Sequence, residues 1–97
     1  MENKIYISNL FDLYEGLLTD KQKEYFKAYY FDDLSLSELS ENYHISRNAI
    51  HKQIKEAIYK LQFYEEKLML YQKKKRIYDI MNQIEDHHIK KQLKELL

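Results

Sequence analysis

The near absence of glycine and proline is the feature that most restricts how this chain can fold. Its 97 residues contain one Gly and no Pro. Tight hairpins and glycine turns need those residues, so the composition argues strongly for an all-α fold. A chain of this length forms one compact unit with a modest core, too small for a large buried catalytic cleft. We therefore expect a single helical domain over residues 1–97.

Several function classes are disfavoured by what the chain lacks. It contains no Cys, which removes disulfides, thiolate chemistry and zinc fingers and fits a reducing compartment. With one Gly it cannot form a P-loop, a GxGxxG loop or a GxSxG turn, and no catalytic triad is apparent. It shows no basic leader followed by an apolar run, and no apolar run of membrane length. We expect a soluble, cytoplasmic, non-enzymatic protein without a cofactor.

Residues 34–61 have the pattern of a helix-turn-helix. Ser35 and Glu38 form a capping box that begins a short helix at about residues 36–43. A turn follows, and Ser46 is the expected N-cap of a second helix. Apolar residues then recur at helical spacing: Ile50, Ile54, Ala57, Ile58 and Leu61. Two capped helices joined by about four residues are typical of the unit that lays its second helix in the major groove of DNA, here at about residues 35–61.

Two further helices are predicted before this unit. Periodic apolar residues predict a helix over residues 4–16, which Gly16 would end because glycine takes the left-handed conformation without penalty. Thr19 and Gln22 form a capping box for a helix that runs to about Phe31. The expected core consists of Leu10, Phe11, Tyr14, Phe26, Leu39, Ile45, Ile50 and Ile54.

The chain after the helix-turn-helix, about residues 62–97, is predicted to be a helical extension. Apolar residues in steps of four and three predict that the second helix continues from Ser46 to about residue 72. These apolar residues form a stripe along the helix, which we call the seam. Asp86 is the expected cap of a final short helix. The end of the seam, exposed on a long helix, would mediate a homodimer, or residues 77–97 would fold back and cover it within one chain. The seam residues in question are Leu61, Tyr64, Leu68 and Tyr71.

The outward face of the second helix carries side chains suited to nucleic acid. They are Arg47, Asn48, His51, Lys52, Lys55 and Tyr59. Arg and Asn pair with guanine and adenine edges, Lys binds phosphates, and base-reading residues occupy the first turns of such a helix. The alternative is a helix-turn-helix used for docking, with this face merely solvated. An acid-free run over residues 46–55 favours nucleic acid, whereas a net charge of zero counts against it.

The charges are distributed unevenly along the chain. Residues 1–45 hold four Lys or Arg against nine Asp or Glu, whereas residues 46–97 hold twelve against seven. This asymmetry indicates a basic half that faces a polyanion, or simply a solvated dipolar surface. A second basic patch would bind phosphates or an acidic protein, or lie in solvent: Lys73, Lys74, Lys75 and Arg76. His87 and His88 would point about 100° apart on a helix, so we expect no metal site.

Residues 36–61, with the preceding Ser35, resemble the promoter-reading region 4 of bacterial sigma factors. The shared positions are Ser35, Glu38, Leu39, Ser40, Ile45, Ser46, Ile50, Ala57 and Leu61. The small YlxM family of Gram-positive bacteria and mycoplasmas is similar to this chain over NLFDLYEGLLTDKQKEYFKAYYFDDLSLSELSENYHISRNAIHKQIKEA at residues 9–57, with YEEKLMLY at residues 64–71. The resemblance covers about residues 5–72. One departure is His44, where the sigma pattern has Gly, which would cost about 1 kcal/mol if its backbone is left-handed.

The resemblance implies a function as well as a fold. YlxM-like proteins are helix-turn-helix regulators of sigma region 4 type, encoded beside the signal recognition particle GTPases. The resemblance also implies that nucleic acid is contacted through Arg47, Asn48, His51, Lys52 and Lys55. The implied partners are promoter DNA or the signal recognition particle RNA, together with the targeting GTPases. The alternative is a protein-interaction adaptor without nucleic-acid contact, whose acidic N-terminal half docks a basic partner.

Overall fold

The computed structural model describes residues 3–97 and contains helices but no strand over that range. The helices are α1 (Lys4–Tyr14), η1 (Glu15–Leu17), α2 (Asp20–Tyr30), α3 (Leu36–Tyr43), α4 (Arg47–Leu68), α5 (Leu70–Met81) and α6 (His87–Glu95). The element η1 is a short 3-10 turn that follows α1 directly. None of the helices in this range combines the length and the apolar character that a membrane crossing requires. The predicted all-α helix-turn-helix fold is confirmed.

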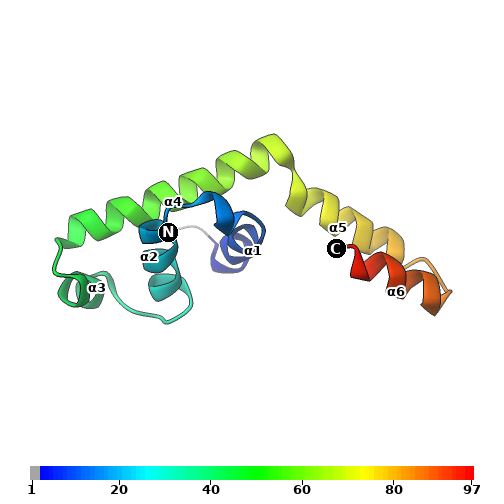
Figure 1. Cartoon of the computed structure of the whole chain (residues 1–97), viewed down its shortest axis with the longest axis horizontal. Coiled ribbons are helices and arrows are strands. Elements are labelled where there is room, and N and C mark those ends of the chain that lie inside the picture. The colour runs from blue at the N-terminus through cyan, green and yellow to red at the C-terminus, as the bar shows by residue number, and fades with distance from the viewer. Residues whose placement is uncertain (1–2) are drawn as a thin grey trace.

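The molecule is elongated, with extents of 54 × 25 × 21 Å. Helices α1, α2 and α3 lie against one side of α4, and α5 and α6 project beyond the C-terminal end of α4 (Figure 1). We call residues 3–68 the helical body and residues 70–97 the C-terminal hairpin. The body contains the helix-turn-helix, so its packing determines how the second helix is presented.

The core of the body is built from the inward faces of its four helices. Its fully buried side chains are Ile7, Leu10, Phe11, Tyr14, Phe26, Leu39, Ile50, Ile54, Ala57 and Leu61. The rings of Phe11 and Phe26 stack with centroids 4.4 Å apart, which joins α1 to α2. Seven of the eight predicted core residues are buried; Ile45 is only partly buried, because it lies in the turn at the edge of the core.

Side-chain caps begin α2, α3 and α4 at the predicted residues. Thr19 and Gln22 exchange two bonds of 3.1 Å, and Ser35 and Glu38 exchange bonds of 3.0 and 3.2 Å. Ser46 accepts a hydrogen bond of 3.1 Å from an amide in the first turn of α4. These bonds satisfy amide donors that a helix start would otherwise leave unpaired.

The predicted role of Gly16 is wrong. Helix α1 ends at Tyr14, and Gly16 lies in η1 without a positive φ. The amide of Leu18 donates to the carbonyl of Glu15 over 3.1 Å. This 3-10 bond turns the chain toward α2 without a left-handed glycine.

The predicted continuation of the second helix to residue 72 is also wrong. Helix α4 is unbroken from Arg47 to Leu68, but Met69 takes a left-handed backbone with φ 55° and ψ 32°. The chain changes direction there, and α5 begins at Leu70 (Figure 1). Tyr71 therefore belongs to α5.

The predicted seam is not an exposed stripe. Leu61 is fully buried, and Tyr64 and Tyr71 pack against the core of the body. Their rings meet α1, with 6.1 Å between the centroids of Tyr14 and Tyr64 and 5.2 Å between those of Tyr6 and Tyr71. Helix α1 therefore covers Tyr64 and Tyr71. Of the four predicted seam residues only Leu68 is exposed.

Candidate nucleic-acid interface

The turn between α3 and α4 fixes the start of the second helix. His44 is left-handed, with φ 54° and ψ 38°, and ends α3. The hydroxyl of Ser40 donates to the carbonyl of Ile45 over 2.6 Å, and the amide of Ile45 donates back to the carbonyl of Ser40 over 3.3 Å. Ser46 then caps α4. Because each step of the turn is bonded, α4 has a defined direction relative to α3.

The buried side of α4 also fixes which side chains face solvent. Ile50, Ile54 and Ala57 are fully buried, and Leu61 continues this inward face. The rotation of α4 about its axis is therefore set by the core. A polar side chain on the opposite face is displayed by a rigid element.

Five of the six predicted contact residues lie together on this outward face. They line a shallow hollow of about 540 Å³ with one further residue, Glu56: Asn48, His51, Lys52, Lys55 and Tyr59. Arg47 is exposed at the first position of α4, next to the hollow in sequence but outside its lining. Four of the five are exposed and His51 is half-buried. The first turn of α4 contains no acidic residue, so the positive end of its dipole is not neutralised there.

Glu56 is the member of this hollow that sequence reasoning missed. It follows Lys52 by four residues, a spacing that places the two on one helix face. Helical spacing alone would have identified it. A carboxylate here repels phosphate, so the hollow suits contact through a few cations and base edges rather than through a broad basic surface.

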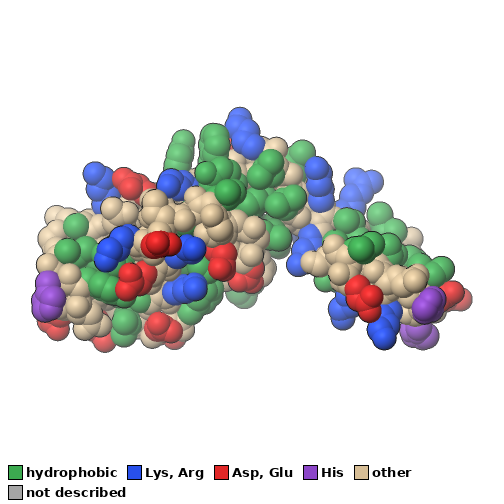
Figure 2. Space-filling model, viewed as in Figure 1, with side chains coloured by type: hydrophobic (Ala, Val, Ile, Leu, Met, Phe, Trp, Pro, Cys, Tyr) green, Lys and Arg blue, Asp and Glu red, His purple; other side chains and the backbone are tan. Residues whose placement is uncertain are grey.

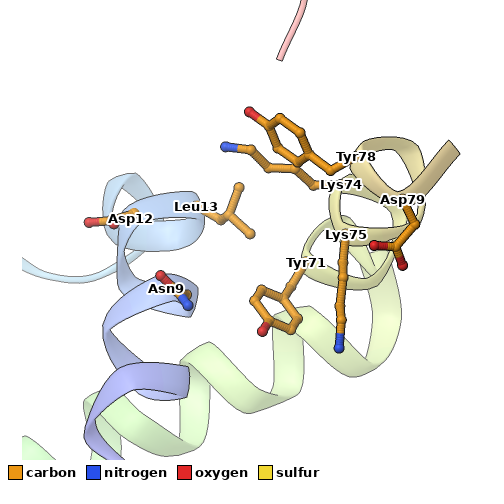
Figure 3. Close-up of a pocket in the computed structure, with 8 residues that line it drawn as sticks. All are labelled: Asn9, Asp12, Leu13, Tyr71, Lys74, Lys75, Tyr78 and Asp79. Carbon is orange, nitrogen blue, oxygen red and sulfur yellow. The ribbon is translucent and has the colours of Figure 1, made fainter. Parts of the chain in front are cut away.

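The predicted second basic patch is divided by the fold. Lys74 and Lys75 line a hollow of about 370 Å³ between α1 and α5, where Asp12 and Asp79 add acidic side chains. The side chain of Lys74 extends toward α1, whereas that of Lys75 points elsewhere (Figure 3). Lys73 and Arg76 are exposed and do not line this hollow. The four cations therefore do not form one phosphate-binding surface.

The joint between α4 and α5 is a buried polar cluster that sequence reasoning also missed. Glu65 is buried, and its carboxylate accepts from the Tyr14 hydroxyl at 2.7 Å and from the amides of Tyr71 and Gln72 at 2.9 and 3.2 Å. The amide of Leu70 donates to the Tyr14 hydroxyl over 3.1 Å. These bonds replace the missing side-chain cap of α5. A charged residue four positions after Leu61, on the inward face, was the available signal.

Burial and the neighbouring carboxylate change the acidity of this cluster. Burial, together with the hydrogen bond to Glu65, raises the pKa of Tyr14 to about 12. Burial, with the charge of Glu65, also raises the pKa of Tyr6. Both effects oppose formation of a phenolate beside a carboxylate.

A metal centre finds no support in the described part of the chain. Over residues 3–97, no three His, Cys, Asp or Glu side chains come together in an arrangement that could hold an ion. His87 and His88 are both exposed at the start of α6.

An all-α chain with a bonded turn and a capped, outward-facing second helix is a helix-turn-helix protein. The family model described as "Putative helix-turn-helix protein, YlxM / p13 like" matches residues 1–97, and the chain belongs to this family, UPF0122. A UPF0122 protein of Bacillus licheniformis is 43% identical over 89 residues, covering 89% of this chain and 83% of the relative. One of a Geobacillus species is 40% identical over 91 residues, with coverages of 94% and 83%. One of Bacillus cereus is 38% identical over 102 residues, with coverages of 100% and 93%.

Proposed function

We propose that this protein is a non-enzymatic regulator or accessory factor that binds nucleic acid through the outward face of α4. One observation carries the proposal: Asn48, Lys52 and Lys55 share an exposed hollow on a helix whose opposite side is locked in the core. Lysines of this kind bind phosphates, and Asn can pair with an adenine edge. The helix start, where Arg47 lies, is the part that enters a groove in such proteins.

The target is either promoter DNA or the signal recognition particle RNA. The first follows from the likeness to sigma region 4 and the second from the position of YlxM-like genes beside the targeting GTPases. Three cations on this face, Arg47, Lys52 and Lys55, lead us to expect a modest phosphate footprint. Binding should therefore weaken with salt, but less steeply than for a strongly basic domain.

Titration of labelled promoter DNA and of that RNA at two salt concentrations tests the proposal. Lys52→Ala and Lys55→Ala should each reduce the slope of log affinity against log salt by about one. Lys27→Ala is the matched control, because Lys27 is an exposed lysine on α2 outside this face, and its slope should equal that of the unaltered protein. Absence of binding to both nucleic acids at low salt contradicts the proposal.

A second candidate function is a protein-interaction adaptor of the targeting machinery. Three consecutive large apolar side chains at the α4–α5 joint, Leu68, Met69 and Leu70, are 45%, 43% and 41% exposed. Such a run is unusual on a monomer surface unless it contacts a partner. Under this proposal the acidic N-terminal half binds the partner, so Asp32→Lys with Asp33→Lys abolishes binding to a purified targeting GTPase, whereas Lys52→Ala leaves it unchanged. The opposite pattern favours the nucleic-acid function.

A second copy of the chain is another partner that fits exposed apolar side chains. In the hairpin, Ile80, Ile89 and Leu96 are 51%, 45% and 82% exposed. Sedimentation equilibrium at micromolar concentration measures the outcome: a mass near 12.0 kDa rejects a homodimer, and twice that mass supports it. If Leu68 lies in the interface, Leu68→Asp reduces the larger mass.

A further inference from the structure

Helix α4 displays two aromatic rings beyond the turns that would read a groove. Tyr59 is 68% exposed and Phe63 is 42% exposed. Their ring planes lie within 25° of each other, with centroids 6.4 Å apart. Residues four apart share a helix face, so the two rings form a small flat surface that continues the outward face of α4. Large rings usually bury most of their area, and a pair left in solvent on such a face suits a ligand with a flat face of its own.

These rings lie well beyond the start of α4, the part of the helix that would enter a groove. Tyr59 lies twelve residues after Arg47, about 18 Å further along the axis at 1.5 Å per residue. Base-reading residues occupy the N-terminal turns of a recognition helix, and a straight helix cannot follow the curving groove over such a length. The rings therefore lie at the edge of a bound duplex. Bases inside a duplex are stacked on one another, so only an unpaired base can offer its face to Tyr59 or Phe63.

Cations lie on both sides of the aromatic pair. Lys55 shares the hollow with Tyr59, and the amine of Lys67 lies 5.6 Å from the ring centroid of Phe63. Phosphates that flank a stacked base could meet either lysine. Glu56 and Glu66 are exposed on the same stretch. They limit the net attraction, so binding here depends on ring stacking more than on charge.

We propose that Tyr59 and Phe63 form a stacking platform for unpaired bases of an RNA whose paired stem lies along the start of α4. The inference rests on the proposed nucleic-acid function and names the class of nucleic acid. A paired stem beside loops or bulges is the usual form of a folded RNA, whereas genomic DNA is a continuous duplex. The two halves of the outward face, cations first and rings second, match a stem followed by unpaired nucleotides.

A protein partner is the competing occupant of this surface. Hydrophobic side chains gather over the C-terminal half of α4, with a basic side chain among them (Figure 2). Leu17 and Leu68 are also exposed. A protein would use this whole area and would accept aliphatic replacements of the rings. Nucleobases need flat rings, which separates the two occupants experimentally.

The test compares two RNA probes of equal length and charge, a hairpin with a bulge beside its stem and a fully paired duplex. Tyr59→Ala with Phe63→Ala should weaken binding of the bulged hairpin by about tenfold or more, since each base–aromatic stack is substantial. Binding of the duplex should change less than twofold. Tyr59→Leu with Phe63→Leu should behave like the Ala pair, whereas Tyr59→Phe should bind as the unaltered protein does. The side chains are exposed, and circular dichroism checks that each variant folds.

A direct readout of stacking comes from Tyr59→Trp, because the chain has no other Trp. Its emission should be quenched by the bulged hairpin and little changed by the duplex. Three results would overturn the platform and leave the proposed function intact. They are unaltered binding by the variant with both Leu replacements, an equal loss of affinity for both probes in the variant with both Ala replacements, and equal affinity of the unaltered protein for both probes. If neither probe nor promoter DNA binds at low salt, both the platform and the proposed function fail.

Discussion

The helical body and the C-terminal hairpin are stabilised in different ways. In the body, side chains from α1, α2, α3 and α4 converge on one core in which nine large residues are fully buried. In the hairpin, Met81 is the one buried apolar residue, and α6 buries none. Ile80 and Ile89 leave about half of their area in solvent. Isolated helices as short as α5 and α6 are marginal in water, so the hairpin depends on its attachment.

That attachment is mostly polar. Tyr14 and Glu65 bind the first three amides of α5, and the ring of Tyr71 meets that of Tyr6 edge to face. The body is therefore held by packing, and the direction of the hairpin by a few buried hydrogen bonds. The proposed nucleic-acid face belongs wholly to the body. A change in the joint should move the hairpin without altering that face.

The largest expected effect is loss of the body core. Phe26→Ala removes a fully buried ring that stacks on Phe11, and it should lower the free energy of unfolding by about 3–5 kcal/mol. Ile80→Ala in the hairpin is the comparison, because half of that side chain is already in solvent, and its effect should be below about 1 kcal/mol. Urea denaturation followed by circular dichroism measures both. Similar losses for the two variants contradict the difference between the regions.

The next effect is uncapping of α5. Glu65→Ala leaves the Tyr14 hydroxyl and two amides of α5 without their acceptor, which should cost about 2 kcal/mol. Hydrogen exchange should quicken at the amides of Tyr71 and Gln72, with those of α2 unchanged.

Two variants control this experiment. Glu66→Ala removes the exposed neighbouring carboxylate and should have little effect. Glu65→Gln retains an acceptor and should keep part of the protection. If exchange in α2 quickens as much as in α5, the joint supports the whole fold rather than the hairpin alone.

The sequence predicts the body better than the hairpin for a physical reason. Capping boxes act over three residues, and apolar periodicity over four, so the starts of α2, α3 and α4 and most of the core follow from local patterns. The same periodicity identified the outward face of α4. Helix-turn-helix geometry was predicted on these grounds and is confirmed. The contact role of that face stays a prediction.

The joint was missed because its one local signal, a carboxylate on the inward face of α4, does not identify the groups that bind it. Glu65 and Tyr14 are 51 positions apart, and no pattern relates them. Met69 ends α4 in a left-handed conformation without the Gly or Asn that usually marks such a position. The heptad pattern continues past Met69 without a break, because α1 covers Tyr64 before the bend and Tyr71 after it. Likewise, the division of the cations at residues 73–76 depends on where α1 meets α5.

Alkaline pH should weaken the joint through Tyr14. The folded pKa of Tyr14 is raised to about 12 from 10.0, so in the unfolded chain this hydroxyl ionises first. Its contribution to stability is complete below pH 10 and is lost as the pH rises toward 12, with a slope of up to about 1.4 kcal/mol per pH unit. Lysines also lose charge in this range, so the informative quantity is a difference between variants.

Tyr14→Phe should flatten that fall in stability between pH 10 and 12 relative to the unaltered protein. Tyr59→Phe is the matched control, because that ring lies in solvent away from the joint, and its pH profile should follow that of the unaltered protein. Denaturation at several pH values provides the measurement. Parallel profiles for Tyr14→Phe and the unaltered protein would contradict the role given to burial and Glu65.

The smallest expected effect compares two of the three described residues with a positive φ, His44 within the body and Met69 between the regions. His44→Gly removes the steric penalty of φ 54° and should raise the free energy of unfolding by about 0.5–1 kcal/mol, less the entropy that glycine gains in the unfolded chain. Met69→Gly relieves the same penalty at φ 55°, but it also removes a side chain that is 43% exposed and loosens the bend. His44→Gly should therefore stabilise the body and leave the exchange of α5 unchanged. Met69→Gly should quicken exchange in α5 with little change in global unfolding. If His44→Gly destabilises the body, the side chain of His44 contributes contacts that outweigh its backbone strain.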